Sequence, residues 1–194
     1  MDFSVPRPKL HSDDQILQAA QTVLLNKGPA EFTLSDVANA VGISRAALIQ
    51  RFKDKANLHH RVMEQMTQEV RDYFATAPTE RGLAPLWEML KDLIAGMGPG
   101  RGSEVHLLLL WGDCTNPQLR ALAGERNELV RAAIEFRLPA EPHDPRPTSA
   151  LIQAVIQGAF MQWMVAREGE LAAFMAVRTR QILTTLYPGH PFAD

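Results

Sequence analysis

Residues 33–52, TLSDVANAVGISRAALIQRF, constrain the fold more than any other stretch, because two short apolar patterns meet there at one tight turn. The first half carries four apolar residues at the spacing i, i+3, i+4 and i+7 of an amphipathic helix, namely Leu34, Val37, Ala38 and Val41. Thr33 precedes them as the expected N-cap, and Asp36 takes the third position of a capping box. We expect Gly42 to end this helix in the left-handed conformation and Ser44 to cap the next one. Together they make a helix-turn-helix pattern.

The second helix, about residues 45–52, presents a face suited to a DNA groove. It buries Leu48 and Phe52, which are four residues apart, and so directs the opposite side outward. The outward face and its flanks comprise Ala46, Ala47, Ile49, Gln50 and Lys53. The alanines let the backbone approach a groove floor, and Gln50 has the paired donor and acceptor that suit adenine. Arg45 and Arg51 are long enough to contact guanine or phosphate.

Positive charge is concentrated around this helix. Between residues 42 and 60 there are four cationic side chains and one acidic one, Asp54. The local net charge is therefore about +3, whereas the whole chain has a net charge of -2. The weak overall charge excludes a histone-like protein that binds DNA through global attraction. A hydrophobic content of 46% indicates a globular chain, so any contact with DNA must be local and geometric.

The run FTLSDVANAVGISRAALIQRFKDKANL resembles the DNA-binding domain of the TetR family of transcriptional regulators, over about residues 13–62. The resemblance implies that Thr33 and Lys55 contact phosphates and that residues 44–51 lie in the major groove. Where the family usually has Tyr, this chain has Ile49, which cannot donate a hydrogen bond to phosphate. Arg51 stands where His is common and can supply that anchor. The predicted DNA-binding residues are Thr33, Ser44, Arg45, Ala46, Ala47, Ile49, Gln50, Arg51 and Lys55.

Helical patterns continue through the rest of the chain without strand alternation, which predicts an all-α fold. Residues 1–11 form an expected flexible arm, and residues 12–60 a three-helix domain that contains the helix-turn-helix. The first helix should stop at Lys27-Gly28-Pro29. Residues 61–188 should form a helical bundle, which by resemblance binds an effector and dimerises. In it, residues 105–111 are apolar on all sides and should be buried, and the proline-rich residues 139–147 should be an exposed loop.

The last two helices, about residues 148–166 and 169–186, are the expected dimer interface. The first carries a ridge of small residues, Ala150, Ala154 and Gly158, that permits close approach of another helix. In the TetR family such a pair forms a four-helix bundle between two subunits, although packing within one subunit would leave the same pattern. The predicted interface residues are Ala154, Gly158, Phe174 and Ile182.

Wide or flat apolar side chains in the same region are candidates for an effector pocket. They are Met66, Phe74, Trp87, Trp111, Phe160 and Trp163. Ordinary core packing explains most stripes of this kind, but few charges are available nearby to bind a polar solute. If a pocket exists, its composition favours an apolar or aromatic small molecule over a sugar, a metal or a charged metabolite.

Several features bear on location and cofactors. The start of the chain lacks the apolar core of a signal peptide, and the longest apolar run, residues 107–111, is far shorter than the ~20 residues that span a bilayer. We therefore expect a cytoplasmic protein with no membrane partner. His59 and His60 are neighbours on one helix and diverge by about 100°, so they cannot chelate one metal together. No metal or cofactor is expected.

Three functions remain open at this point. The first is a ligand-responsive repressor that binds a palindromic operator in double-stranded DNA as a homodimer and is released by a small molecule. The second is an all-α enzyme whose nucleophile would be Cys114, near Asp113 and His106, although a lone cysteine is more often a small buried residue. The third is a helical adaptor, which would show no sequence preference on DNA. We expect the first, and no enzyme.

Overall fold

The computed structural model describes residues 11–98, 100 and 102–193, and within them it contains helices, turns and loops but no strand. The predicted all-α fold is therefore confirmed. Apart from His11, the predicted N-terminal arm lies outside the described residues. In chain order the helices are α1 (Asp13–Glu31), α2 (Leu34–Val41), α3 (Arg45–Phe52), α4 (Lys55–Thr76), α5 (Leu83–Ala95), α6 (Glu104–Thr115), α7 (Pro117–Arg137), α8 (Pro145–Ala166) and α9 (Leu171–Leu186).

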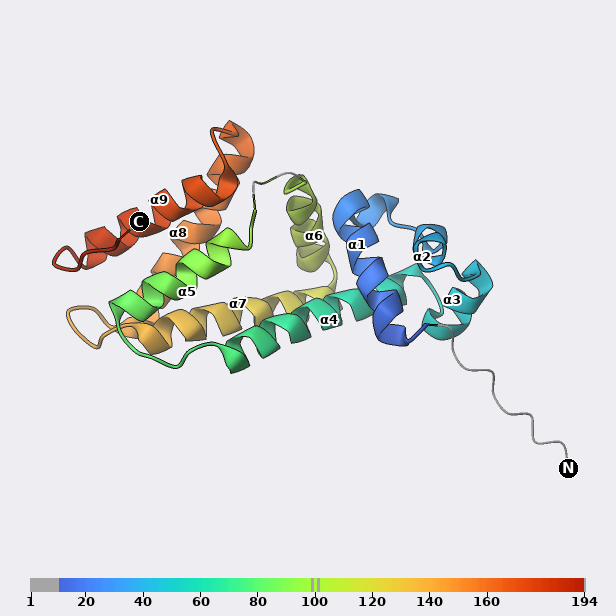
Figure 1. The fold of residues 1–194 in the computed structure, drawn as a ribbon, viewed down its shortest axis with the longest axis horizontal. Coiled ribbons are helices and arrows are strands. Elements are labelled where there is room, and N and C mark those ends of the chain that lie inside the picture. Colours follow the sequence, from blue (N-terminus) through green and yellow to red (C-terminus); the bar gives the residue numbers. More distant parts are fainter. Residues whose placement is uncertain (1–10, 99, 101, 194) are drawn as a thin grey trace, which may run out of the picture. The chain divides into compact units, whose positions relative to one another are not determined.

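The chain divides into two compact units by its internal contacts. One unit combines the chain up to residue 66 with residues 105–122, and the other combines residues 67–104 with the chain from residue 123 onward. Helices α4 and α7, labelled in Figure 1, therefore contribute residues to both units. The sequence-based domains, residues 12–60 and 61–188, rest on a different criterion and stay a prediction.

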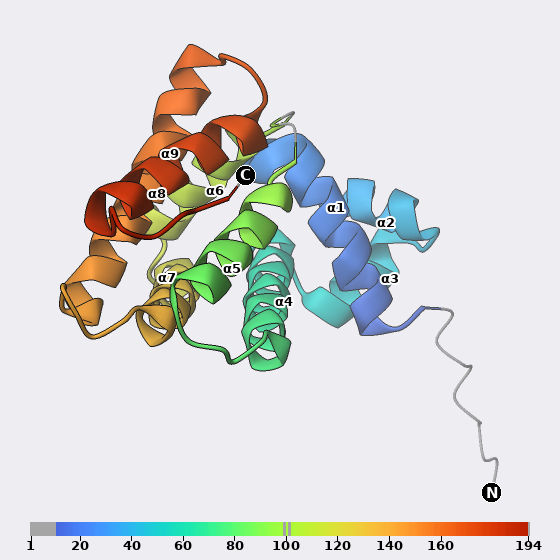
Figure 2. The same ribbon diagram turned by 60° about the vertical axis from the view of Figure 1, so that its left-hand side comes forward.

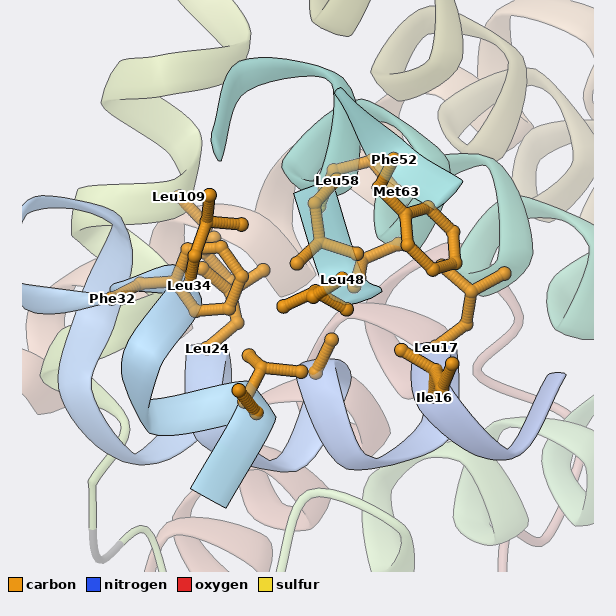
Figure 3. Packing of buried hydrophobic residues seen from close by; sticks show 14 of the residues in the cluster. Ile16, Leu17, Leu24, Phe32, Leu34, Leu48, Phe52, Leu58, Met63 and Leu109 are labelled. Atoms are coloured by element: carbon orange, nitrogen blue, oxygen red, sulfur yellow. The ribbon is translucent and has the colours of Figure 1, made fainter. Parts of the chain in front are cut away.

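The first unit encloses the helix-turn-helix in one apolar core. Helix α1 packs against α2, and α2 packs against α3. Figure 3 shows side chains of α1, α2, α3, α4 and α6 converging on this core. Its most deeply buried members include Ile16, Leu24, Phe32, Val37, Leu48 and Leu58. Because α1, α4 and α6 surround the two short helices on their apolar side, the opposite side of α3 is left for contact outside the protein.

Helix α1 departs from the expected stop at Lys27-Gly28-Pro29. Gly28 leaves the helical conformation with a φ of 75° and a ψ of 165°, but a short helical turn follows and carries α1 on to Glu31. The sequence locates the break correctly and misplaces the end, because proline at the first position of a new turn needs no N–H partner. A side chain at Gly28 would approach Leu108 Cδ1 to 3.0 Å, so the kink also allows close packing on α6.

The prediction that residues 105–111 are buried on all sides is wrong. Val105 and Leu109 are buried in the core of the first unit, whereas Leu108, Leu110 and Trp111 are exposed, Trp111 by 71%. An apolar composition all round a helix indicates burial only where other elements cover every face. Within the described chain, one side of α6 is left uncovered.

The second unit contains α5, α8 and α9, together with most of α7 and the end of α4. Helices α8 and α9 lie side by side in both views of the ribbon, and α5 packs against α9 (Figures 1 and 2). Two apolar clusters form its core. The first includes Leu86, Trp87, Leu90, Ile134, Ile152 and Leu183, and the second includes Ile94, Ala159, Trp163, Leu171 and Met175.

Arg167 fastens the loop after α5 to the turn between α8 and α9. It donates hydrogen bonds to Gly100 O (3.3 Å) and Ser103 Oγ (3.4 Å), and it pairs with Glu104 at 3.1 Å. Its guanidinium also stacks 4.8 Å from the ring centre of Trp163. Hydrogen bonding to its own backbone N–H and then to Arg167 lowers the pKa of Glu104. We call these five residues the Arg167 clasp.

Helix α8 begins earlier than the prolines of residues 139–147 predict. Asp144 caps it by accepting a hydrogen bond from the Arg146 N–H at 3.1 Å, and Pro145 and Pro147 lie in the first turn, where a missing N–H costs nothing. The prediction of a loop is therefore wrong for residues 145–147. By length and composition α8 is long and apolar enough to cross a membrane, a test that the core helix of a soluble protein also passes.

Candidate nucleic-acid interface

The N-terminus of α2 is fixed by a reciprocal capping box. Thr33 Oγ1 accepts from the Asp36 N–H at 3.1 Å, and an Asp36 carboxylate oxygen accepts from the Thr33 N–H at 3.2 Å. Lys27 Nζ reaches the other carboxylate oxygen at 2.6 Å. Hydrogen bonding to Lys27, followed by that to Thr33, lowers the pKa of Asp36. The predicted N-cap of α2 is therefore confirmed. Lys27 of α1 stabilises it further through Asp36, a contact that the sequence did not indicate.

The turn between α2 and α3 has the predicted geometry. Gly42 adopts a φ of 76° and a ψ of 31°, and its N–H donates to Ala38 O at 2.9 Å. A Cβ at Gly42 would meet nothing within 4 Å, so glycine is needed for its backbone conformation rather than for space. Ser44 Oγ then accepts from the Ala47 N–H at 3.1 Å and starts α3. These local hydrogen bonds set the angle between the two helices.

Helix α3 presents the face that the sequence predicts. Leu48 and Phe52 are buried, with Phe52 only 3% exposed, and Ile49 packs half-buried against the same core. Ala46, Gln50 and Lys53 are exposed and Ala47 is half-buried. Gln50 makes no hydrogen bond, and neither does the exposed Arg45, to any residue that the structure describes. Their polar groups are available to an outside partner.

Two of the predicted DNA contacts are occupied within the protein. Arg51 Nη1 donates to His11 O at 2.8 Å and lies 3.5 Å from a carboxylate oxygen of Asp13. Lys55 Nζ donates to Ala30 O at 3.0 Å, near the end of α1. Since nearly 40 residues separate Arg51 from its partners, no local pattern in the sequence points to this contact.

The predicted pocket residues do not form one group. Met66 packs against the core of the first unit, where Trp111 is exposed. Phe74 and Trp87 belong to one cluster of the second unit, while Phe160 and Trp163 belong to the other. Both buried indoles are satisfied, because Trp87 donates to Ala193 O at 2.6 Å and Trp163 to Gly169 O at 3.2 Å. Their role in binding an effector stays a prediction.

Two of the four predicted interface residues, Gly158 and Ile182, line a groove between α8 and α9. Ala154 and Gly158 are exposed, and Phe174 and Ile182 are half-buried. An open groove of about 380 Å³ runs between the two helices, lined by Val155, Gly158, Ala159, Gln162, Arg178, Gln181, Ile182 and Thr185. Large apolar side chains are exposed on the same two helices, namely Leu151, Met161, Val165 and Val177. None of the predicted pocket residues lines this groove.

The three residues of the enzyme alternative differ in their exposure to solvent. Cys114 is exposed, whereas Asp113 is buried and His106 is exposed two turns of α6 earlier. No group of three or more His, Cys, Asp or Glu side chains among the described residues could hold a metal ion.

Comparison with known proteins identifies the helix-turn-helix and its context. Residues 16–62 match the family model described as bacterial regulatory proteins, tetR family. The chain is 33% identical over 168 residues to the HTH-type transcriptional regulator TtgR of Pseudomonas putida, a match that covers 78% of this chain and 79% of TtgR. It is 35% identical over 81 residues to a probable HTH-type transcriptional regulator of Pseudomonas putida, ArpR, but there the match spans 41% of this chain and only 38% of the relative.

A solved structure confirms the architecture. The multidrug binding protein EbrR, in complex with imidazole, superposes with a TM-score of 0.66 at 20% identity, over 90% of this chain and 96% of that one. At this identity the likeness shows the fold alone. The family model matches most of α1, all of α2 and α3 and the first turns of α4, and the match to TtgR extends over most of both chains. This chain therefore belongs to the TetR family of transcriptional regulators, which are DNA-binding proteins and not enzymes.

Proposed function

We propose that this protein is a cytoplasmic repressor that binds a palindromic operator as a homodimer and is released by a small apolar or aromatic molecule. The observation that carries this proposal is the outer face of α3. There Gln50 and Arg45 have no partner among the described residues, and the small side chain of Ala46 lies between them. Such a face can enter a major groove and hydrogen-bond to base edges without giving up contacts inside the protein.

The exposed side of α8 and α9 supports a homodimer. Val165 is 87% exposed and Val177 54%, although other residues of the same two helices, such as Ile152 and Met175, are buried in the core. A second copy placed across a two-fold axis would cover both side chains with the same surface. Exposed Gly158 has no atom within 4 Å of a Cβ position, so the groove floor is open to a side chain of that second copy. A two-fold protein in turn requires a two-fold operator.

A small effector is supported by the composition of the second unit and by similar proteins. EbrR, whose structure resembles this one, has been solved in complex with malachite green and with proflavin, two aromatic compounds. Of the aromatic side chains predicted to meet such a ligand, Phe74, Trp87, Phe160 and Trp163 belong to the second unit, whereas Trp111 belongs to the first. An effector releases DNA only if it binds the non-operator conformation more tightly. Bound operator must then lower the affinity for the effector by the same factor.

The operator is testable with a randomised duplex pool. The parent protein should select a palindrome and prefer it over a scrambled duplex at moderate salt. Gln50→Ala should cost about 1–3 kcal/mol on that palindrome and relax specificity at one base pair in each half-site. The ammonium of Lys55 keeps donors besides the one that binds Ala30 O, so it can still bind a phosphate and Lys55→Ala should weaken all sequences alike. A parent protein that prefers neither duplex would exclude the repressor and favour the adaptor.

The homodimer is tested by sedimentation at micromolar concentration. The parent protein should sediment as a dimer, and Gly158→Arg should give a monomer or an aggregate that no longer binds the palindrome, because it places an unpaired charge in the interface. Gly124→Arg is a matched control, since Gly124 is also exposed, in α7, with no atom near its Cβ position. A parent protein that sediments as a monomer would contradict the homodimer.

The effector is tested by fluorescence of the three tryptophans. Compounds that change the emission should also release the palindrome in a competition assay. Compounds that bind tightly and leave operator affinity unchanged would show that the second unit is not a switch of this kind.

A further inference from the structure

Arg51 lies in the last turn of α3 but is directed toward α1 rather than outward. Its side chain is 20% exposed, it donates to His11 O at 2.8 Å, and it pairs with Asp13 at 3.5 Å. By contrast, Arg45 and Lys53, at either end of the same helix, are exposed and have no partner among the described residues. Arg51 is thus the cationic residue of α3 whose side chain is bound by groups of the protein itself.

The partners of Arg51 flank the beginning of α1. His11 and Asp13 lie on either side of Ser12, the N-cap of α1, which closes a capping box with Gln15. The acceptors are therefore part of an ordered helix start rather than a loose segment. A guanidinium presents its donors in a rigid plane, so this contact fixes direction as well as distance. It ties the end of α3 to the start of α1.

The remaining anchors of α3 leave one movement open. Leu48 and Phe52, four residues apart, lie nearly on one line along the helix, so their burial alone permits a roll about that line. Ile49 packs against the core on one flank, and Arg51 is held on the other. A helix with its side chains is about 10 Å across, so a roll of about 10° would move the outer side chains by roughly 2 Å.

A displacement of this size decides whether a base contact forms. Hydrogen bonds require donor and acceptor within about 3 Å, so a shift of roughly 2 Å at Gln50 would break a bidentate contact with a base. Phosphate contacts made by long, exposed side chains tolerate such a shift better, because these chains can readjust. Loss of the Arg51 contact should therefore reduce specificity more than general affinity.

We propose that Arg51 is a positioning residue for DNA recognition. Held by His11 and Asp13, it sets the roll of α3 and so determines where Gln50 and Arg45 meet the base edges, and it does not itself contact DNA. This role rests on the DNA-binding function above and reassigns a residue expected to contact DNA directly. The competing arrangement is that Arg51 leaves Asp13 and binds a phosphate when DNA is present.

The two arrangements differ in their salt dependence and in the role of Asp13. Binding of the selected palindrome and of a scrambled duplex is measured by fluorescence anisotropy over a range of salt, at a temperature where circular dichroism shows every variant folded. Arg51→Gln should lower the palindrome-to-scrambled preference by about tenfold and leave the salt slope unchanged. Asp13→Asn should lower the same preference, and the double variant should be no worse than Arg51→Gln alone. Arg51→Lys should recover part of the loss.

Matched controls separate this role from neighbouring effects. Asp14→Asn removes the other acidic residue in the first turn of α1 and should leave the preference unchanged. Arg45→Gln removes an unpaired cation and should weaken binding without affecting the coupling to Asp13. A salt slope that falls by about 0.9 in Arg51→Gln, with no effect of Asp13→Asn, would assign Arg51 to a phosphate and overturn the proposal. A lower melting temperature with an unchanged preference would also overturn it.

A measurement without DNA keeps this role separate from the proposed operator. Residual dipolar couplings of the backbone amides report the orientation of α3 relative to α1 in the free protein. Arg51→Gln should change that orientation and Arg45→Gln should not. If the parent protein prefers no duplex, the proposed repressor function is wrong. The orientation of α3 in the free protein then still shows whether Arg51 positions this helix. An unchanged orientation in Arg51→Gln overturns the positioning role.

Discussion

Replacing Gly100 with alanine should destabilise the second unit strongly. Gly100 is buried with a φ of 84°, a conformation that costs an L-residue about 1–2 kcal/mol. An added Cβ would lie 2.2 Å from Trp163 Cη2 and 2.9 Å from Leu171 Cβ. Trp163 cannot move aside cheaply, because it is 3% exposed, donates to Gly169 O and stacks on Arg167.

The clash should add about 1–3 kcal/mol of overpacking, so the total loss in free energy of unfolding is about 2–5 kcal/mol. For a chain of this size this corresponds to a fall in melting temperature of roughly 4–20 °C. Gly102→Ala is the matched control, since Gly102 has a φ of 73° and no atom within 4 Å of a Cβ. It should cost only the conformational part, about 1–2 kcal/mol.

The assay is thermal unfolding of both variants followed by circular dichroism at one protein concentration, because dimerisation would make the melting temperature depend on concentration. If Gly100→Ala melts no lower than Gly102→Ala, the close approach of Gly100 to Trp163 is not maintained in solution. The inference that Trp163 packs too closely on Gly100 to admit a side chain would then be refuted.

Two further predictions concern the first unit. Burial, with smaller contributions from Lys55 and His60, lowers the pKa of His59 below its ordinary 6.5. As pH drops below 6.5, His59 takes up a proton in the unfolded chain but stays neutral in the folded one. The free energy of unfolding should therefore fall in this range. The free energy of unfolding is measured by urea titration at several pH values. His59→Gln should reduce its dependence on pH, whereas His60→Gln should largely keep it. An unchanged pH dependence in His59→Gln would contradict the assignment. Leu48→Ala removes a fully buried side chain and should lower the free energy of unfolding by about 2–5 kcal/mol, with a loss below about 1 kcal/mol arguing against its central place in the core.

The helix-turn-helix was predictable from sequence because its determinants are local. The side chains of Thr33 and Ser44 accept hydrogen bonds three residues along the chain, and Gly42 takes the left-handed conformation that residue type and position indicate. The outward face of α3 follows from the spacing of Leu48 and Phe52 alone. In each case a residue's neighbours in sequence are also its neighbours in space.

The remaining features depend on contacts between distant segments. Nothing near Arg51 in the sequence indicates that its partners lie at the start of α1, and the exposure of Trp111 depends on which elements fail to cover α6. The predicted pocket shows the same limit. The sequence shows only that its residues are large and apolar, and their division between separate clusters, as for Phe74 and Phe160, follows from tertiary packing.

The single cysteine of the chain makes the natural sequence suitable for site-specific labelling. Cys114 is exposed at the end of α6, so a maleimide dye attaches there without removal of any other thiol. In a two-fold dimer the two labels would be related by symmetry, and energy transfer between a donor and an acceptor would report one distance between the two first units. The same labelled protein could then be followed through the addition of operator and of each candidate effector.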